Sequence, residues 1–268
     1  MSIRLIAVDL DDTLLNAAVG ISPHTQDVIR QAVAKGIAVT VATGRMHCSA
    51  LPYAQQLGLD VPLITYNGAM IRRSLSGETL LHVPIEQEIA REVLSLFRSR
   101  GWYIQTYTQD KLYVAEINAK ARYYENLAGV KAIPVGDELY TMSELPTKML
   151  AMAEPEEISR IQHVMQGLFG DRLSMATSKP NYLEMVAPGV NKGKSLAFLA
   201  AMLNIPREEV MAIGDSHNDL DMIQYAGWGV AMGNAADKVK AAARLVTRSN
   251  EEDGVAEAIE RYALQDCR

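Results

Sequence analysis

Short apolar runs that stop abruptly at polar residues constrain this sequence more than any other feature. Helical patterns separate these runs, which cover residues 3–8, 37–42, 62–66, 210–213, 229–232 and 245–247. Nearly continuous apolar runs of this length are typical of strands that are buried on both faces of a parallel sheet. The repeated order of strand, helix and strand predicts an α/β fold, with a Rossmann-like parallel sheet and right-handed crossovers.

Start and stop signals mark the helices between these runs. Ser22 and Pro23 form an N-cap followed by proline at the first helical position, and Gly36 ends that helix. Further helices are predicted at residues 47–57, 193–203, 220–226, 236–243 and 255–264. Polar residues follow the strands at their carboxyl ends, and this edge of an open parallel sheet is where ligands bind.

The middle of the chain follows a different pattern. Polar and apolar residues alternate in the strand candidates, at residues 103–107, 111–117, 148–153 and 182–187. Alternation predicts an antiparallel sheet with one wetter face, and helices are expected at residues 86–100, 119–127 and 156–169. Proline and glycine cluster near Val83-Pro84 and Pro188-Gly189. We therefore expect a core domain of residues 1–82 and 189–268, interrupted by an α+β domain of residues 83–188.

Composition excludes several classes of partner. The chain has 268 residues, of which 49% are hydrophobic, and a formal net charge of −6 without a basic block. Nucleic acid would require a positive surface, so it is not expected as a partner. The N-terminal apolar run is too short to span a membrane, and no signal-peptide pattern follows it. Cys48 and Cys267 lie far apart, so a disulfide framework is not expected and a reducing cytoplasm is the default location.

Carboxylates crowd at the end of the first strand. Asp9, Asp11 and Asp12 follow it, and like charges this close repel by about 4 kcal/mol per pair at an intermediate effective dielectric. A second acidic pair, Asp215 and Asp219, follows a later strand. If both strands are central in one sheet, Asp9, Asp215 and Asp219 meet. A divalent cation would offset their repulsion, and Mg²⁺ suits such oxygen ligands best.

Hydroxyl, amide and ammonium donors are predicted near the same edge of the sheet. Thr43 and Gly44 follow the second strand, and Lys192 precedes a helix whose free amides favour an anion. A phosphate dianion cannot approach bare carboxylates, so both Mg²⁺ and Lys192 are required electrostatically. A carboxylate nucleophile, a divalent metal and donors around the equatorial oxygens together indicate phosphoryl transfer.

Each of these residues also has a purely structural interpretation. An aspartate after a strand is often a turn or helix cap, and this is the preferred role of Asp12. Arg45 is balanced between a substrate contact and a surface salt bridge of little energetic weight. Asn67 is expected to shape a tight turn with Gly68, and Asp219 could cap the helix that follows it. The functional interpretation depends on all of these groups occurring together.

Four segments resemble the motifs of the haloacid dehalogenase superfamily. They are AVDLDDTLL at residues 7–15, Thr43-Gly44-Arg45, Asn191-Lys192-Gly193, and GDSHNDLDM at residues 214–222. The long insert between the second and third motifs resembles the type IIB cap of the Cof-like phosphatases. The resemblance covers essentially the whole chain, and it implies the Rossmann-like core of that superfamily with an inserted α+β cap.

The resemblance implies a role for each motif residue. Asp9 would attack phosphorus, and Asp11 would act as general acid and then as general base, with a pKa raised by the neighbouring carboxylates. Mg²⁺ would be held by Asp9, Asp215 and the main-chain carbonyl of Asp11, while Asp219 would ligate it or orient its waters. The phosphate would be held by Thr43, Gly44, Lys192, Asn218 and the amide of Leu10.

These roles describe a Mg²⁺-dependent phosphatase that acts on a small phosphate monoester, such as a sugar phosphate or a phosphorylated cofactor, through an aspartyl phosphate. One alternative is a phosphohexomutase on a similar core and cap, which would return the phosphoryl group to a sugar. Another is a non-catalytic receiver-like phosphoacceptor domain, which also uses an acidic pocket, Mg²⁺, threonine and lysine. Receiver domains are much shorter, and the sequence carries no signal for an oligomeric state.

Overall fold

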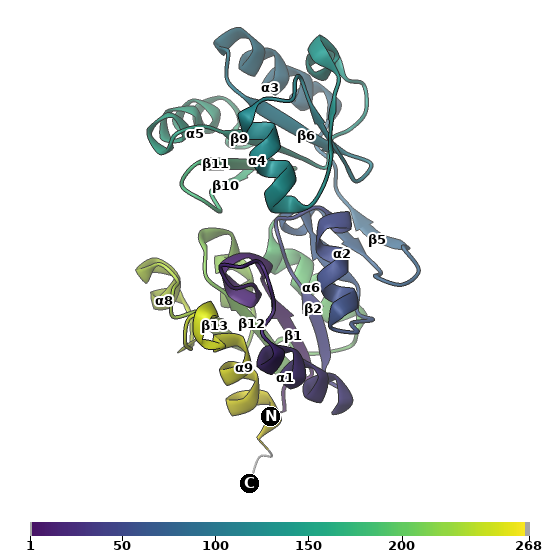
Figure 1. Cartoon of the computed structure of the whole chain (residues 1–268), viewed down its shortest axis with the longest axis vertical. Helices are drawn as coiled ribbons and strands as arrows, with labels where there is room; N and C mark the ends of the chain where they lie inside the picture. The colour runs from purple at the N-terminus through teal and green to yellow at the C-terminus, as the bar shows by residue number, and fades with distance from the viewer. Residues whose placement is uncertain (1, 266–268) are drawn as a thin grey trace.

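The computed structural model describes residues 2–265, which form two parts lying end to end (Figure 1). The two ends of the sequence build the lower part, called the core below, and the middle of the sequence builds the upper part, called the insert. Cys267 lies outside the described residues. No helix between residues 2 and 265 combines the length and the apolar character that a membrane crossing requires.

The core is built around a five-stranded parallel sheet with strand order β14-β13-β12-β1-β2. Its strands are β1 (Leu5–Val8), β2 (Ala38–Val41), β12 (Val210–Gly214), β13 (Trp228–Ala231) and β14 (Leu245–Val246). Strands from opposite ends of the sequence lie side by side, since Val8 pairs with Val41 on one side and with Ile213 on the other. The predicted parallel α/β sheet is confirmed.

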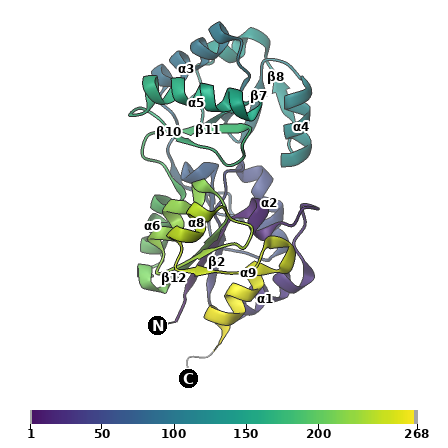
Figure 2. The same cartoon turned by 90° about the vertical axis from the view of Figure 1, so that its left-hand side faces the viewer.

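Helices cover both faces of this sheet (Figure 2), because successive residues of a strand point to opposite sides. Ile6 and Val8 belong to one apolar cluster with α1, α2 and α9, whereas Leu5 and Ala7 pack with α6 and α7. The helices of the core are α1 (Pro23–Ala34), α2 (His47–Gln56), α6 (Lys192–Met202), α7 (Leu220–Tyr225), α8 (Asp237–Ala242) and α9 (Gly254–Ile259). Burial on both faces explains why the strands read as continuous apolar runs.

A small antiparallel sheet extends one edge of the core. Its strand order is β3-β4-β5, with β3 (Leu63–Thr65), β4 (Met70–Arg72) and β5 (Thr79–His82). A parallel bridge between Ala42 and Ile64 joins it to the end of β2. From the sequence, β3 is predicted but β4 and β5 are not.

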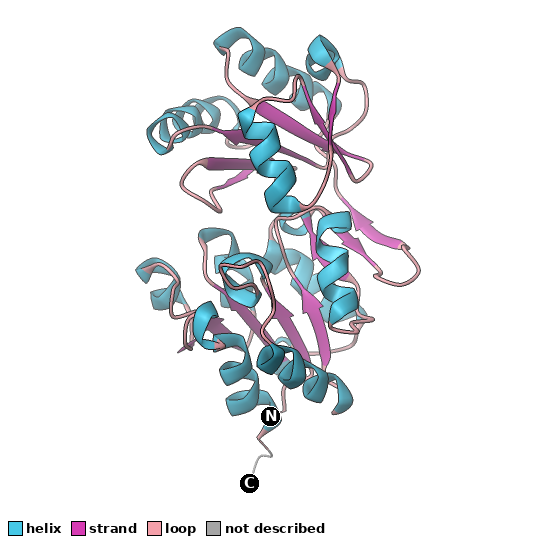
Figure 3. Cartoon of the chain, viewed as in Figure 1, coloured by secondary structure: helices cyan, strands magenta, loops and turns pink. Residues whose placement is uncertain are grey.

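The insert is a six-stranded sheet with strand order β10-β11-β9-β6-β7-β8. Its strands are β6 (Ile104–Thr108), β7 (Lys111–Val114), β8 (Ala132–Pro134), β9 (Lys148–Met152), β10 (Ser174–Ala176) and β11 (Tyr182–Val186). The pair β7 and β8 is parallel and the other pairs are antiparallel. Helices α3 (Gln87–Arg100) and α5 (Pro155–Phe169) cover one face, and α4 (Ala119–Ala128) packs on the other (Figure 3). The predicted α+β character of the insert is confirmed.

The prediction that the sheet of the insert has one wetter face does not hold for β6, β9 and β11. Every residue of β6, β9 and β11 is buried, since one face packs on α3 and α5 and the other faces α4 and the core. Gln105, Lys148 and Glu184 are polar residues of these strands, and all three are buried. Their alternation with apolar residues therefore reflects a polar junction inside the protein and not contact with solvent.

The chain crosses between the two parts twice. It leaves the core between β5 and α3 and returns between β11 and α6. These crossings contain the predicted hinges at Val83-Pro84 and Pro188-Gly189, and the division into residues 1–82, 83–188 and 189–268 stays a prediction. Gly189 has a φ of +73°, which a residue with a Cβ rarely adopts, so glycine is favoured at the second crossing.

Candidate active site

The carboxyl ends of β1 and β12 bring acidic residues from opposite ends of the sequence together. Asp9 follows β1 directly, and its amide donates to the carbonyl oxygen of Ile213 at 3.0 Å. Asp215 follows Gly214, the last residue of β12. A Cβ on Gly214 would lie 2.5 Å from the Cβ of Asp219, so glycine allows the next turn to fold back closely.

Three carboxylates form a compact group at this edge. One oxygen from each of Asp9, Asp215 and Asp219 lies within 4.8 Å of the others. Asp9 and Asp219 are buried, whereas Asp215 is half-buried and accepts a hydrogen bond of 2.6 Å from the hydroxyl of Thr13. Oxygen donors that converge at this spacing fit a hard divalent cation.

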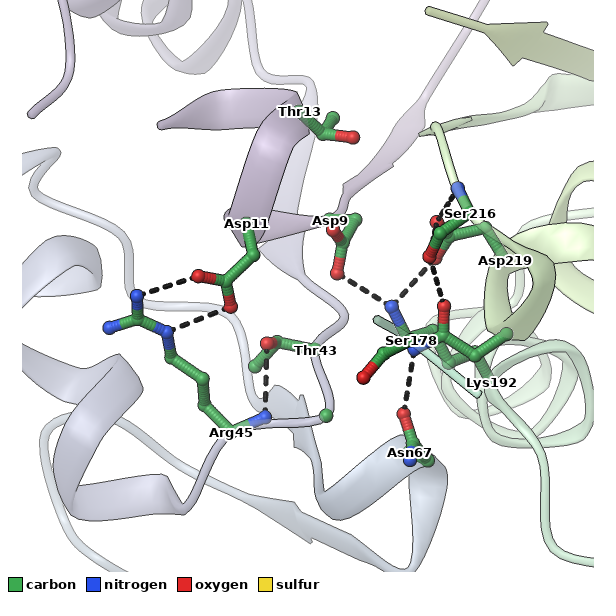
Figure 4. A network of polar contacts seen from close by, with 12 residues as sticks. Asp9, Asp11, Thr13, Thr43, Arg45, Asn67, Ser178, Lys192, Ser216 and Asp219 are labelled. Atoms are coloured by element: carbon green, nitrogen blue, oxygen red, sulfur yellow. Dashed lines mark hydrogen bonds and ion pairs between the residues drawn. The ribbon is translucent and has the colours of Figure 1, made fainter. Parts of the chain in front are cut away.

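Lys192 supplies positive charge inside this group (Figure 4). Its Nζ donates to Asp9 Oδ1 and to Asp219 Oδ1, both at 2.6 Å, and its side chain is fully buried. Asn191 caps the helix that begins here, since its side chain accepts from the Lys194 amide. Burial alone would lower the pKa of Lys192, but attraction to Asp219 and Asp9 outweighs burial and raises that pKa. The ammonium group therefore stays charged.

The carboxylates are only partly neutralised. Burial raises the pKa of Asp9 well above its ordinary value; Lys192 opposes this rise, and Asp219 and Asp215 add to it. Burial and Asp219 raise the pKa of Asp215 to about 7, although the hydrogen bond from Thr13 opposes the change. One buried ammonium group thus does not balance three carboxylates, and a further cation would be attracted to the face that they share.

Asp11 points toward Arg45 (Figure 4). Its two oxygens accept from Arg45 Nη2 at 2.7 Å and from Arg45 Nε at 2.9 Å, which makes a bidentate pair. The Arg45 side chain is buried, and its guanidinium group also lies over the ring of Tyr53. The Arg45 side chain is shielded from solvent and Asp11 is half-buried, so the pair is more buried than the surface salt bridge considered from the sequence.

The expectation that neighbouring carboxylates raise the pKa of Asp11 is wrong for this structure. Burial does favour the neutral acid, but the hydrogen bonds and the charge of Arg45 outweigh it, and the pKa falls below its ordinary value. Lys179 and Lys192 act in the same direction. Asp11 is therefore ionised near neutral pH while Arg45 holds it.

The residues predicted to bind phosphate surround the carboxylates. Thr43 and Gly44 follow the end of β2, Asn218 follows β12, and all three line one pocket with Asp9 and Asp11. The space open to water in this pocket is about 50 Å³, which holds a few water molecules at most. A larger molecule needs more space than the insert leaves over the core in this structure.

Asn67 does more than shape the turn predicted for it. Its φ of 56° places it in the tight turn before Gly68, and its side chain also connects the two parts of the protein. Nδ2 donates to Glu184 of the insert, and Oδ1 accepts from Asn218 Nδ2 at 3.0 Å. Leu10 differs from these residues, because its side chain is buried and a ligand could meet only its main chain.

The insert contributes pocket residues that are not among the predicted catalytic, metal and phosphate-binding residues. Most are polar or aromatic, namely Tyr124, Lys148, Ser178, Lys179, Tyr182 and Glu184, and Leu127 and Ala128 add apolar surface. Lys148 and Glu184 form an ion pair of 3.3 Å, with both side chains buried. A charged residue within an otherwise apolar strand was the signal available in the sequence, since such residues are rarely buried unless they are paired.

Comparison with known sequences agrees with this arrangement. A model of the haloacid dehalogenase-like hydrolase family matches residues 6–259. The Bacillus subtilis protein named 5-amino-6-(5-phospho-D-ribitylamino)uracil phosphatase YcsE is 33% identical over 270 residues, which cover 98% of this chain and 97% of that one. The likeness therefore includes the core, the insert and all four sequence motifs.

Solved structures share the same fold. A haloacid dehalogenase-like hydrolase from Bacteroides thetaiotaomicron has a TM-score of 0.88 at 31% identity, covering 97% of this chain and 99% of that one. The subclass IIB sugar phosphatase BT4131 has a TM-score of 0.85 at 25% identity, covering 98% of this chain and 100% of that one. The core with an inserted type IIB cap, expected from the resemblance, is confirmed.

Proposed function

This chain belongs to the haloacid dehalogenase-like hydrolase family and is a phosphatase of that kind, and we propose that Asp9 is its nucleophile. Asp9 attacks the phosphorus of a small phosphate monoester in the presence of Mg²⁺, and water then hydrolyses the aspartyl phosphate. One observation carries this proposal: Asp9, Asp215 and Asp219 converge around the buried ammonium group of Lys192.

The attachment of Asp9 supports its role. Its amide donates a hydrogen bond to the carbonyl oxygen of Ile213, and its Oδ1 accepts one from Lys192 Nζ. The carboxylate is therefore oriented before a substrate binds. A nucleophile that is already oriented loses less entropy when it reaches phosphorus. The same lysine is also placed to attract the phosphoryl oxygens, because its charge lies next to the attacking group.

Asp11 is proposed to transfer the protons. Ionised beside Arg45, it is suited to accept a proton from the water that attacks the aspartyl phosphate. It must first be protonated to donate to the leaving oxygen, and a bound phosphate dianion favours this because nearby negative charge raises a carboxyl pKa. Arg45 lines the same pocket, so the proposed substrate contact requires its guanidinium group to be shared between Asp11 and the substrate.

Mg²⁺ is proposed to bind the oxygens of Asp9 and Asp215, together with the main-chain carbonyl of Asp11. The donor set consists of oxygen atoms, which suits this ion, and when bound it supplies the charge that lets phosphate approach the carboxylates. Asp219 would ligate the ion or orient its waters. It also holds the site together, because its Oδ1 accepts from Lys192 and its Oδ2 accepts from the amides of Asp215 and Ser216.

The phosphate oxygens are proposed to be held by donors on several loops of the core. These donors are the side chains or amides of Leu10, Thr43, Gly44, Lys192 and Asn218. Thr43, Gly44 and Asn218 line the pocket beside Asp9, and Lys192 touches Asp9 directly, which supports this assignment. The amide of Leu10 is adjacent to the nucleophile along the chain.

The substrate is proposed to be a small phosphorylated metabolite, with neither nucleic acid nor membrane as a partner. Relatives named as a sugar phosphatase and as a phosphoribitylaminouracil phosphatase support a hydroxylated leaving group. Tyrosine, serine and charged side chains of the insert line the pocket, and such groups suit hydroxyl recognition. A cytoplasmic location is proposed, since two cysteines far apart in the sequence do not predict a disulfide framework.

Removal of divalent metal is expected to abolish turnover. With EDTA, release of phosphate from p-nitrophenyl phosphate should fall to background, and added MgCl₂ should restore it, because the carboxylates otherwise repel the substrate. Mg²⁺ should also raise the thermal unfolding temperature, since it binds the folded state alone. Full activity in EDTA would contradict the proposed site.

The same preparation, supplied with Mg²⁺, tests the alternatives. A panel of sugar phosphates and ribityl phosphates should yield free phosphate. Formation of an isomeric hexose phosphate without free phosphate would instead support the phosphohexomutase alternative. An aspartyl phosphate that persists for minutes would support the receiver-like alternative, because a phosphatase intermediate is hydrolysed within its own turnover.

Replacing Gly44 with alanine is expected to weaken closure of the insert over the site. A Cβ there would lie 2.9 Å from Asn67 Oδ1 and 3.0 Å from Glu184 Oε2, and hydrogen bonds hold both atoms in place. We expect kcat/KM for p-nitrophenyl phosphate to fall by about tenfold to a hundredfold. Gly167→Ala is the matched control, because nothing lies within 4 Å of a Cβ at that helical position. Equal steady-state kinetics for both variants would count against this expectation.

A further inference from the structure

A buried lysine of the insert contacts the main chain of the loop that begins at Thr43. Lys148 is the first residue of β9, and its Nζ donates to the carbonyl oxygen of Gly44 at 2.6 Å. The same Nζ lies 3.3 Å from Glu184 Oε2 and 4.8 Å from the centre of the Tyr107 ring. The side chain is buried, so its charge acts on these neighbours with little screening by solvent.

The Gly44 carbonyl belongs to the Gly44–Arg45 peptide group, which also contacts the hydroxyl of Thr43. The N–H group of that peptide, on Arg45, donates to Thr43 Oγ1 at 3.1 Å (Figure 4). The ammonium group that donates to this carbonyl fixes the plane of the peptide group. It also polarises the N–H group of the same peptide, which then donates more strongly. The threonine oxygen accepts this bond, so its single O–H group is left to donate in another direction. Thr43 lines the pocket that also contains Asp9.

We propose that Lys148 is a positioning residue which, as the insert closes, acts through the Gly44–Arg45 peptide to orient the Thr43 hydroxyl toward the phosphoryl group. This inference rests on the proposed function, because it assumes that phosphate binds at Thr43. Lys148 reaches Gly44 from a strand of the insert, so the contact is lost whenever the insert moves away. Binding of phosphate and closure of the insert over the core are therefore coupled, because the loop that begins at Thr43 is fully ordered only when the insert is closed.

A second contact from the same ion pair runs to the other phosphate-binding loop. Glu184 accepts from Asn67 Nδ2, and Asn67 Oδ1 accepts from Asn218 Nδ2 at 3.0 Å. The pair of Lys148 and Glu184 thus reaches both the loop after β2 and the loop after β12. Glycine at position 44 lets Glu184 come this close to the loop after β2, since a Cβ there would lie 3.0 Å from Glu184 Oε2.

Binding of inorganic phosphate to the Mg²⁺-loaded protein tests the inference without turnover. In calorimetric titrations, Lys148→Met should weaken phosphate binding by about tenfold, because a charge-assisted hydrogen bond on the loop is lost. Lys131→Met removes an exposed lysine of the insert and should leave binding unchanged. In a Thr43→Val background, Lys148→Met should cost little further affinity, since the hydroxyl that it orients is absent. Unchanged phosphate binding in Lys148→Met, or an equal loss in both backgrounds, would overturn the inference.

Kinetics distinguish positioning from direct contact with the leaving group. If Lys148 acts through Thr43, Lys148→Met should lower kcat/KM by the same factor for p-nitrophenyl phosphate and for a sugar phosphate. A loss confined to the sugar phosphate would overturn the inference, because it would mean that Lys148 touches the leaving group. A wild-type protein that hydrolyses no phosphate ester with Mg²⁺ would refute the proposed function itself, which is a different result from an active wild type with an unaffected variant.

A second variant serves as the control for disturbed folding. Lys148→Met alone leaves Glu184 as a buried carboxylate without its ammonium partner, which could disturb the insert. Lys148→Met/Glu184→Gln removes both charges and keeps a side chain of similar shape. The double variant should retain the wild-type unfolding temperature within a few degrees and still bind phosphate about tenfold more weakly. Wild-type phosphate affinity in this folded double variant would overturn the inference.

Discussion

Asp9→Asn is expected to lower kcat for p-nitrophenyl phosphate by at least about 10⁴-fold while the protein remains folded. An amide has nearly the same shape as a carboxylate but no charge, so it cannot attack phosphorus. Asp9 is attached through its main-chain amide and through Oδ1 to Lys192, and an asparagine oxygen can keep the second of these bonds. The loss should therefore appear in kcat, with the circular dichroism spectrum unchanged.

The same substitution is expected to stabilise the metal-free protein. Burial, with Asp219 and Asp215, raises the pKa of Asp9 despite Lys192, so the folded state binds more protons than the unfolded state. Such a group lowers stability as pH rises above its unfolded pKa, and removing its charge removes that cost. In this variant the loss of stability that remains should run from about pH 4 to about pH 7, between the ordinary and the raised pKa of Asp215, and level off above pH 7. Unfolding temperatures measured in EDTA across pH test this sign.

Asp12→Asn is the matched control for Asp9→Asn. Asp12 lies in the same turn but is exposed, and its φ of 59° is one that asparagine adopts readily. This variant should keep nearly all of the wild-type kcat. A folded Asp9→Asn enzyme with kcat close to wild type would remove Asp9 as the nucleophile and leave the convergence of the carboxylates to be explained by metal binding alone.

The core half of the site was predictable from the sequence because its residues directly follow strands. Asp9, Thr43 and Asp215 each come after an apolar run, and the runs are recognisable because both faces of a parallel strand are buried. The register of the sheet then brings them together without any further information. Strands such as β4 and β8 were missed because a polar residue or a proline interrupts each apolar run.

The half of the site contributed by the insert could not be predicted in the same way. Lys148 and Glu184 meet Gly44 and Asn67 only because the insert packs against the core. Sequence spacing contains no measure of that distance. The pKa of Asp11 was wrong for a related reason: its direction depends on whether the carboxylate faces its acidic neighbours or Arg45, and side-chain direction is decided by packing.

The stability of the cluster of Asp9, Asp215 and Asp219 depends on Lys192, because Lys192 is the cation that bridges Asp9 and Asp219. Lysine and the carboxylates are buried together, so the desolvation of each is offset by the others. Removing a carboxylate relieves repulsion, whereas removing the ammonium group leaves repulsion without compensation. The two kinds of substitution are therefore expected to change stability in opposite directions, which a purely steric account of the site does not predict.

Lys192→Met should accordingly destabilise the metal-free protein by about 3 kcal/mol, or roughly 10 °C in unfolding temperature, and lower kcat by about 10³-fold. Mg²⁺ should restore part of the lost stability by supplying positive charge, so its effect on the unfolding temperature should exceed that seen in wild type. Turnover should stay low, because the donor next to Asp9 is gone. Lys194→Met, an exposed position in the same helical turn, is the control and should match wild type. If Lys192→Met unfolds at the wild-type temperature in EDTA, the acidic group does not depend on this ammonium group for its charge balance.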